Sequence, residues 1–237
     1  MSATSPIVVL GMHRSGTSCL AGSLQQRGLF LGEVYESRPY NRKGNRENQR
    51  IMDLNDAVLA ASGGRWNQPP ARLAWSPAEA AERDAIVAAM EADGDGATWG
   101  FKDPRTLLTL AFWRERLPDA RFAGTFRHPA QVARSLTARD PAMPVEAALE
   151  LWHAYNARLL ALHAEAPFPL VDFDCRRDDY VARVDALARA LGLPAPETHH
   201  DEFFDGALRT PSADITVAPR HLALHAALVD AAATWPG

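Results

Sequence analysis

Short apolar runs along the chain alternate with longer segments in which apolar residues recur every three or four positions. The short runs predict buried strands, at residues 7–10, 98–101, 121–126 and 169–174. The longer segments predict helices, at about 17–27, 46–61, 76–90, 106–117, 127–139, 145–164, 178–192 and 220–234. Strands separated by helices imply right-handed crossovers, and so an α/β fold in which a central parallel sheet is flanked by helices on both faces.

Local signals mark where several helices begin and end. Gly28 and Gly192 follow apolar periodic segments, as glycine commonly does at the C-terminus of a helix. Ser76, Pro77 and Glu79 match a capping box, which predicts a helix start. No internal repeat or low-complexity linker interrupts the 237 residues, a length within the range of one large domain. We therefore expect a single domain over residues 1–237.

The charge balance limits the classes of partner. The 25 basic and 29 acidic residues give a formal net charge of −4, which argues against a general nucleic-acid binder and requires any anion site to be built from a few local cations. No stretch has the roughly 18 apolar residues needed to cross a bilayer, and no targeting signal is found. Cys19 and Cys175 are too few for a disulfide framework, and no metal-binding spacing occurs. We expect a cytoplasmic, metal-free protein with no nucleic-acid partner, whose oligomeric state is open.

The turn after the first predicted strand is the most informative segment. The sequence "GMHRSGTS" at 11–18 keeps the G-x-x-x-x-G spacing of a phosphate-binding loop, in which backbone amides cradle an anion at the start of a helix. Thr17 replaces the lysine that reaches the β- and γ-phosphates in nucleotide triphosphatases, so kinase or ATPase chemistry is disfavoured. Arg14 can supply the missing charge, because a guanidinium pairs with two anion oxygens. The alternative is that Gly11 and Gly16 only form a tight turn.

Positive charge recurs at the ends of the next two predicted strands. Lys102 and Arg105 follow the second strand, in "KDPR", and Arg127 follows the third, in "RHP". Because the carboxyl ends of parallel strands meet at one edge of a sheet, these side chains and the loop are expected to surround one anion pocket. The alternatives are an exposed lysine, and salt bridges from the two arginines to nearby Asp103 or Asp119.

These segments resemble a known family. "RSGTS" at 14–18, "KDPR" at 102–105 and "RHPAQVARSL" at 127–136 are similar to the nucleotide-binding elements of sulfotransferases that use 3′-phosphoadenosine 5′-phosphosulfate (PAPS). The likeness is greatest to bacterial and Golgi-type members, which carry arginine in the loop. The resemblance implies a P-loop-type parallel sheet and an enzyme that transfers a sulfuryl group to a hydroxyl, leaving adenosine 3′,5′-bisphosphate (PAP).

The resemblance also implies which residues bind the donor. The loop is implied to grip the 5′-phosphosulfate through Arg14, Ser15, Gly16, Thr17 and Ser18. Arg127 and Ser135, eight residues apart, are implied to hold the 3′-phosphate. Arg209 is the candidate for a C-terminal basic loop that closes over the nucleotide. Phe173 and Asp174 depart from the pattern, since the family often has Tyr-Glu there.

The implied chemistry assigns further roles. Lys102 is expected to stabilise the leaving phosphate and Arg14 to hold the transferring group. Glu47 matches the family's catalytic glutamate by position and is the expected base; the alternative is an ordinary first-turn glutamate favoured by the helix dipole. Asp103 and His128 are its rivals, although Asp103 is better suited to fixing its turn. His13 is expected to pack near the site.

Three functions remain in competition. The leading hypothesis is a PAPS-dependent O-sulfotransferase acting on a carbohydrate or small hydroxylated metabolite. A degenerate kinase-like phosphotransferase would use ATP and magnesium, held by Asp103 or Asp172. A non-catalytic nucleotide-binding module is the third.

The acceptor is expected to lie against two long polar segments. Residues 33–46 and 63–76 are rich in Arg, Tyr, Trp, Asn and Pro, and loops on a rigid scaffold commonly carry specificity. Tyr35, Trp66 and Trp75 could stack on a sugar ring or could pack the loops down.

Overall fold

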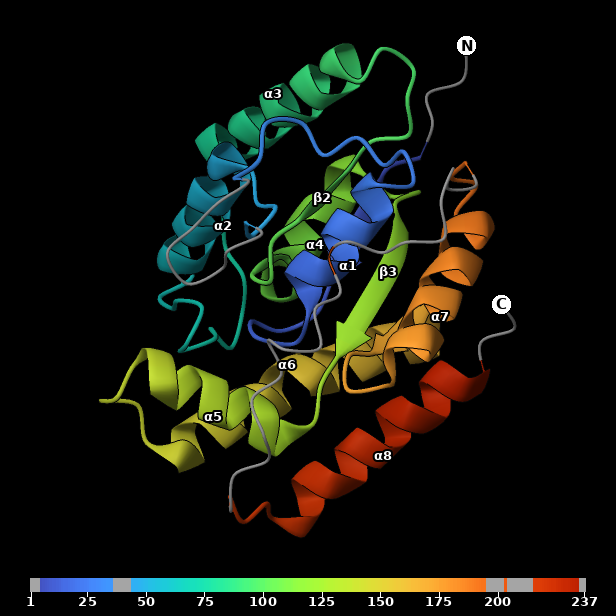
Figure 1. The fold of residues 1–237 in the computed structure, drawn as a ribbon. Helices are drawn as coiled ribbons and strands as arrows, with labels where there is room; N and C mark the ends of the chain where they lie inside the picture. The colour runs from blue at the N-terminus through green and yellow to red at the C-terminus, as the bar shows by residue number, and fades with distance from the viewer. Residues whose placement is uncertain (1–4, 36–43, 195–202, 204–214, 235–237) are drawn as a thin grey trace.

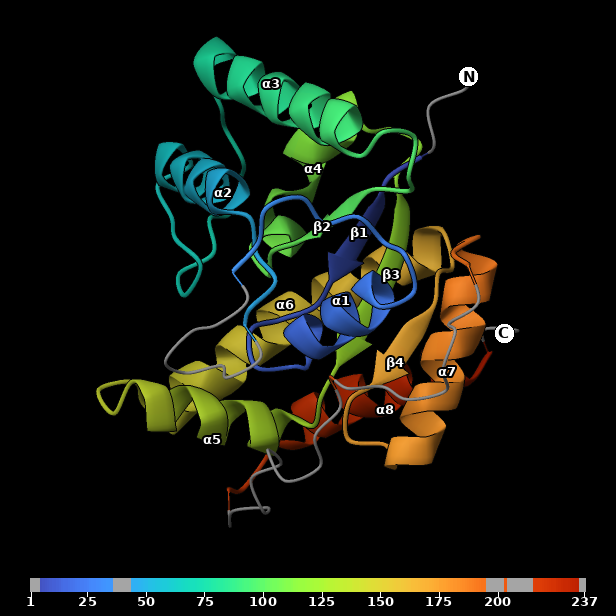
Figure 2. The same ribbon diagram turned by 45° about the horizontal axis from the view of Figure 1, so that its top comes forward.

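The fold is built on one four-stranded parallel sheet (Figures 1 and 2). The computed structural model describes residues 5–35, 44–194, 203 and 215–234. The strands are β1 (Ile7–Leu10), β2 (Gly100–Lys102), β3 (Arg121–Phe126) and β4 (Leu170–Asp172). They lie in the order β2-β1-β3-β4, so the carboxyl ends of the first three strands are adjacent. This order brings the three predicted cationic segments to one edge of the sheet.

Helices cover both faces of the sheet, which confirms the predicted α/β class. They are α1 (Thr17–Gln25), α2 (Gln49–Ala61), α3 (Pro77–Asp93), α4 (Thr106–Arg116), α5 (Pro129–Arg139), α6 (Val145–Glu165), α7 (Arg177–Ala190) and α8 (Pro219–Thr234). Ile7 and Val9 of β1 pack in a hydrophobic cluster with residues of α1 and α7. Val8 and Leu10 point the other way, into a second cluster formed with α2, α4, α6 and α8 (Figure 2).

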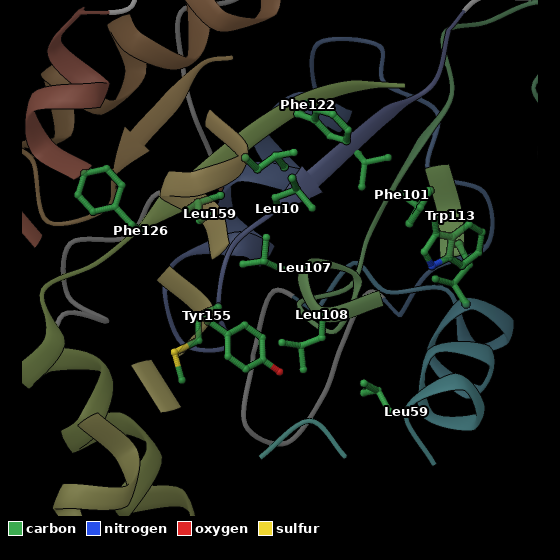
Figure 3. Close-up of a cluster of buried hydrophobic side chains, with 14 of the residues drawn as sticks. Leu10, Leu59, Phe101, Leu107, Leu108, Trp113, Phe122, Phe126, Tyr155 and Leu159 are labelled. Atoms are coloured by element: carbon green, nitrogen blue, oxygen red, sulfur yellow. The ribbon is translucent and has the colours of Figure 1, made fainter. Parts of the chain in front are cut away.

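The second cluster is the larger part of the core (Figure 3). Phe101 from β2 packs against Trp113 of α4 with ring centroids 4.7 Å apart, a separation typical of favourable aromatic pairs. Leu10 of β1 and Leu159 of α6 are fully buried in the same cluster. This packing fixes α2, α4 and α6 around the carboxyl edge of β2 and β1.

Two of the boundaries that differ from the prediction bear on the site. The helix expected from residue 46 begins at Gln49, because the Asn48 side chain accepts hydrogen bonds from the backbone N–H groups of Arg50 and Ile51 and caps it. The strand expected at 98–101 lies at 100–102, so Lys102 is part of the strand. The predicted capping box at Ser76 is present.

Candidate active site

The turn between β1 and α1 has no room for side chains at Gly11 and Gly16, the two glycines of the G-x-x-x-x-G spacing. Gly11 has a φ of 148° and Gly16 a φ of 85°, conformations that favour glycine. A Cβ on Gly11 would lie 2.5 Å from the carbonyl oxygen of Thr125, and a Cβ on Gly16 would lie 2.2 Å from the ring of Phe173. The Thr125 hydroxyl donates to the Ser15 carbonyl at 3.0 Å, which ties the loop to β3.

The same turn leaves polar groups for a ligand. No side chain caps the first turn of α1, where N–H groups and the positive end of the helix dipole favour an anion. The Ser15 hydroxyl is buried and has no hydrogen-bond partner among the described residues. Arg14 has a φ of 66°, which costs a non-glycine residue about 1–3 kcal/mol and is typical of functional turns. The loop therefore fits a phosphate or sulfate group.

Lys102 and Glu47 form a buried ion pair beside this loop. Lys102 Nζ lies 2.5 Å from Glu47 Oε1 and 3.3 Å from Ser18 Oγ at the start of α1. The side chains are only 1% and 10% exposed. The second carboxylate oxygen, Oε2, accepts a hydrogen bond from Asn45 at 2.7 Å. Lys102 is thus not an exposed lysine, and Glu47 precedes the Asn48 cap instead of lying in the first helical turn, so both of these alternatives are wrong.

Arg14 contacts a residue of the following cationic segment. Its Nε donates to Ser135 Oγ at 2.7 Å, across 121 residues of sequence. The family resemblance implies that these two side chains bind opposite ends of the donor, whereas the structure brings them into direct contact. Burial, Arg139 and Arg127 lower the pKa of Arg14, because each disfavours another positive charge. The region between the loop and α5 therefore has a local excess of positive charge, which suits an anion.

Arg127 is held in a fixed orientation next to this pair. Its Nε donates to Asp174 Oδ1 at 3.0 Å, and its guanidinium lies 5.5 Å from the centre of the Phe173 ring. The salt bridge considered from the sequence therefore exists, but its partner is Asp174 and not Asp119. The two residues that depart from the family pattern are the ones that contact this arginine.

Arg105 is neutralised more completely. It pairs with Asp103 at 3.0 Å and with Asp56 at 2.7 Å. Asp103 also accepts from the backbone N–H of Arg105 at 3.0 Å and from the Asn55 amide at 3.0 Å, so it fixes the turn as expected. Burial is the largest influence on Asp103 and raises its pKa. The salt-bridge alternative thus holds for Arg105 with Asp103 and, with a different partner, for Arg127.

The two histidines near the site have different environments. His128 is the N-cap of α5, where its Nδ1 accepts from the backbone N–H of Ala130 at 3.3 Å. His13 lies in the loop with its ring 4.7 Å from Trp66 and 6.2 Å from Tyr155. Burial, followed by the positive charges of Arg105 and Lys102, lowers the pKa of His13 well below its ordinary value. His13 is therefore a neutral imidazole that packs near the site, as expected.

The aromatic residues of the long loops divide into two kinds. Trp75 packs edge-on against Phe112 in the core, 5.5 Å between ring centres. Trp66 stays partly exposed beside His13, and the Tyr155 hydroxyl donates to its carbonyl at 2.8 Å. The Tyr35 hydroxyl donates to Gln49 at 2.5 Å. Trp66 contacts His13 of the anion-binding loop. The C-terminal candidate Arg209 lies outside the described residues.

Two residues of the site were not anticipated from the sequence. Asn55 of α2 is fully buried and also accepts from Thr109 at 2.6 Å and from the Trp113 indole at 2.9 Å. The indole of Trp152, in α6, donates to the Arg127 carbonyl at 2.9 Å. Only the polar residue Asn55, on an otherwise apolar helix face, gave a signal, whereas Trp152 is indistinguishable from core in the sequence.

The described residues offer neither a metal centre nor a membrane-spanning helix. They contain no group of three or more His, Cys, Asp or Glu side chains arranged to hold a metal ion. None of the helices in the described part of the chain is long and apolar enough to cross a membrane.

Two solved protein structures are similar in fold to this chain. The chain is similar in structure to the sulfotransferase domain of the Synechococcus PCC 7002 olefin synthase, with 18% identity and a TM-score of 0.58 over 99% of this chain and 96% of that one. It is also similar to the sulfotransferase STF1 from Mycobacterium tuberculosis H37Rv, with 15% identity and a TM-score of 0.51 over 97% of this chain and 77% of that one. Comparison with curated protein sequences gives no match.

At these identities the structural likeness concerns the fold, and the sequence itself gives the stronger result. A sequence model described as the sulfotransferase family matches residues 6–197. The match includes the loop, Glu47, Lys102, Arg127 and Ser135. The chain therefore belongs to the sulfotransferase family.

Proposed function

We propose that this sulfotransferase moves a sulfuryl group from PAPS to a hydroxyl of a carbohydrate or small metabolite. The observation that carries the proposal is the position of Lys102 Nζ, 2.5 Å from Glu47 Oε1 and 3.3 Å from Ser18 Oγ. A carboxylate that can take a proton and a cation that can stabilise a leaving oxygen thus meet at the end of an anion-binding loop.

The donor has two anionic ends, and the site has two groups of complementary residues. The 5′-phosphosulfate binds the amide groups of the loop and the hydroxyls of Ser15, Thr17 and Ser18. The 3′-phosphate binds Arg127 and Ser135. The 2.7 Å contact between Arg14 and Ser135 supports a place for Arg14 between the two ends, so that it serves the 3′-phosphate as well as the transferring group.

The proposed reaction is an in-line transfer. The acceptor hydroxyl gives its proton to Glu47 while its oxygen forms a bond to sulfur. The bond between sulfur and the bridging oxygen breaks, and its electron pair leaves on the 5′-phosphate oxygen of PAP. Lys102 stabilises the charge on that oxygen, and Arg14 holds the sulfuryl oxygens. The acceptor lies beside the loop near Trp66, which offers a partly exposed ring for a sugar or similar flat group.

Nucleotide binding tests the donor. PAP at about 100 times its Kd should raise the free energy of unfolding by about 2.7 kcal/mol, or the Tm by about 5–10 °C in a protein of this size, with EDTA present throughout. Stabilisation by ATP with magnesium but not by PAP would favour the phosphotransferase. The engagement of Asp103 by Arg105 and Asn55, and of Asp172 by the Asp174 N–H at 2.9 Å, speaks against a metal on either carboxylate.

A transfer assay tests the chemistry. Labelled sulfate should pass from PAPS to a member of a panel of sugars and phenols. Glu47→Gln should lower kcat by about 100-fold or more, while Glu82→Gln, an exposed carboxylate paired with Arg50 at 2.9 Å, should not. PAP binding without transfer to any acceptor would leave the non-catalytic module as the better account.

A further inference from the structure

The peptide unit that joins Arg127 to His128 is held on both sides. Its carbonyl, on Arg127, accepts a hydrogen bond from Trp152 Nε1 at 2.9 Å. Its N–H, on His128, donates to Asp174 Oδ2 at 3.0 Å. The other oxygen of that carboxylate accepts from Arg127 Nε at 3.0 Å. Trp152 and Asp174 therefore fix the direction of the peptide plane, and Asp174 also fixes that of the guanidinium.

The Arg127 carbonyl depends on this side-chain donor because of its place in the chain. The last carbonyl of β3 that accepts a hydrogen bond from the neighbouring chain segment is that of Phe126, whose donor is Phe173 N at 2.9 Å. The first carbonyl used by α5 is that of His128, which accepts from Gln131 N and Val132 N. Arg127 falls between strand and helix and is only 6% exposed. A buried carbonyl without a donor costs about 1–3 kcal/mol, so the indole both satisfies it and sets its orientation.

Trp152 is itself held by the C-terminal helix. It is fully buried, and its ring contacts His221 and His225 of α8, with ring centres 6.2 and 6.4 Å away. The His225 ring also lies 5.0 Å from the ring of His128. In Figure 1 α8 is the red helix below α7, and its His225 ring lies 5.8 Å from the ring of Phe126 at the end of β3. This helix begins at Pro219, after the last residue of the family-model match, residue 197.

We infer that Trp152 is a positioning residue for the 3′-phosphate site, and that α8 holds it in place. The inference rests on the proposed function, because it takes Arg127 as a ligand of that phosphate. Trp152 does not touch the donor. It acts through the Arg127 carbonyl, whose hydrogen bond holds the backbone from which the Arg127 side chain extends to Asp174.

The affinity ratio of PAP to adenosine 5′-monophosphate (AMP) isolates this role, because the two nucleotides differ only by the 3′-phosphate. Trp152→Phe removes the indole N–H and keeps an aromatic ring. It should lower the preference for PAP by about five- to tenfold, the worth of one hydrogen bond. Trp113→Phe is the matched control, since it removes a buried indole N–H that donates to Asn55 at 2.9 Å. Trp113 lies in α4 and packs against Phe101 of β2, away from Arg127 at the end of β3. Both variants should lose stability, but Trp113→Phe should keep the PAP to AMP ratio of the wild type.

The possible outcomes distinguish failure of the Trp152 role from failure of the proposed donor site. Wild-type protein that binds PAP no better than AMP overturns the proposed donor site, and the inference with it. A clear wild-type preference that Trp152→Phe leaves unchanged overturns the inference alone. If Trp152→Phe does not fold, His221→Ala decides, because it removes one ring that supports the indole and leaves Arg127, His128 and Asp174 intact. A reduced ratio in that variant supports the inference, and an unchanged ratio refutes it.

Discussion

Replacing Glu47 by glutamine should destabilise the fold as well as slow the reaction. The substitution removes the charge that balances Lys102, whose side chain is 1% exposed and whose Nζ lies 2.5 Å from the carboxylate. Removing one member of a buried ion pair costs about 3–5 kcal/mol, because the other charge stays buried. Glutamine keeps an oxygen that can accept from Lys102, so we expect the lower end, about 3 kcal/mol. For a protein of this size that corresponds to a Tm lower by about 6–12 °C.

Differential scanning calorimetry or urea unfolding measures this loss directly. The control is Glu82→Gln, which breaks the Arg50 pair at 2.9 Å between side chains that are 50% and 47% exposed, and should change the free energy of unfolding by less than about 1 kcal/mol. Lys102→Met should also be costly alone. In the double variant the two losses should fall short of their sum by about 2 kcal/mol, because no unpaired charge remains buried. A Glu47→Gln shift no larger than that of Glu82→Gln would refute the reasoning.

Three further predictions follow from other parts of the structure. Gly16→Ala should abolish PAP binding and lower the Tm, because its Cβ would lie 2.2 Å from the Phe173 ring. The control is Gly63→Ala, at a similar φ of 71° with nothing within 4 Å, which should lower the free energy of unfolding by only about 1 kcal/mol. Equal losses of stability in the two variants would contradict this reasoning. Asn55→Leu should lower the free energy of unfolding by about 3 kcal/mol in urea titrations, since it leaves several buried polar partners unsatisfied, and a neutral effect would count against the network. The Tm should fall from pH 7.5 to pH 5.5, because four histidines have a native-state pKa below the ordinary value of about 6.5. Over this range the unfolded chain therefore binds more protons than the native state does. The stability that these histidines contribute is full above pH 6.5 and is lost as the pH falls below it. The raised pKa values of Asp103 and Asp172 act in the opposite direction, so a Tm that is flat or rises on acidification would show that the histidines do not dominate. The histidines with lowered pKa are His13, His163, His221 and His225.

The sequence predicted which segments meet, since that follows from strand ends in a parallel sheet. Lys102 and Arg127 needed only the alternation of apolar runs with helices to be placed at one edge. The partner of Arg127 was harder. Asp119 is close in sequence, but Asp174 is the carboxylate that the pairing of β4 with β3 brings alongside, and strand order is not readable from local pattern.

Contacts that depend on side-chain direction were beyond the sequence. Helical periodicity predicts that Trp152 is buried but not that its N–H points at the Arg127 carbonyl. Similarly, the position of Glu47 before the Asn48 cap decides that it faces Lys102, and helix boundaries are uncertain by a few residues in any such prediction. The Arg14 contact with Ser135 spans 121 residues and depends on the left-handed turn at Arg14, which no residue preference would indicate.

The C-terminal helix adds to the hydrophobic core beyond the last residue of the family-model match. Leu228 is fully buried in the same hydrophobic cluster as Phe126 and Trp152, although the shared family sequence ends at residue 197. A truncation at that point would remove Leu228 and Ala232 from the cluster that contains Trp152, so we expect a chain that ends at residue 197 to lose stability. The buried residues of α8 are His221, Leu228 and Ala232. Substitutions there can retune the neighbouring site while every residue that touches a ligand stays the same.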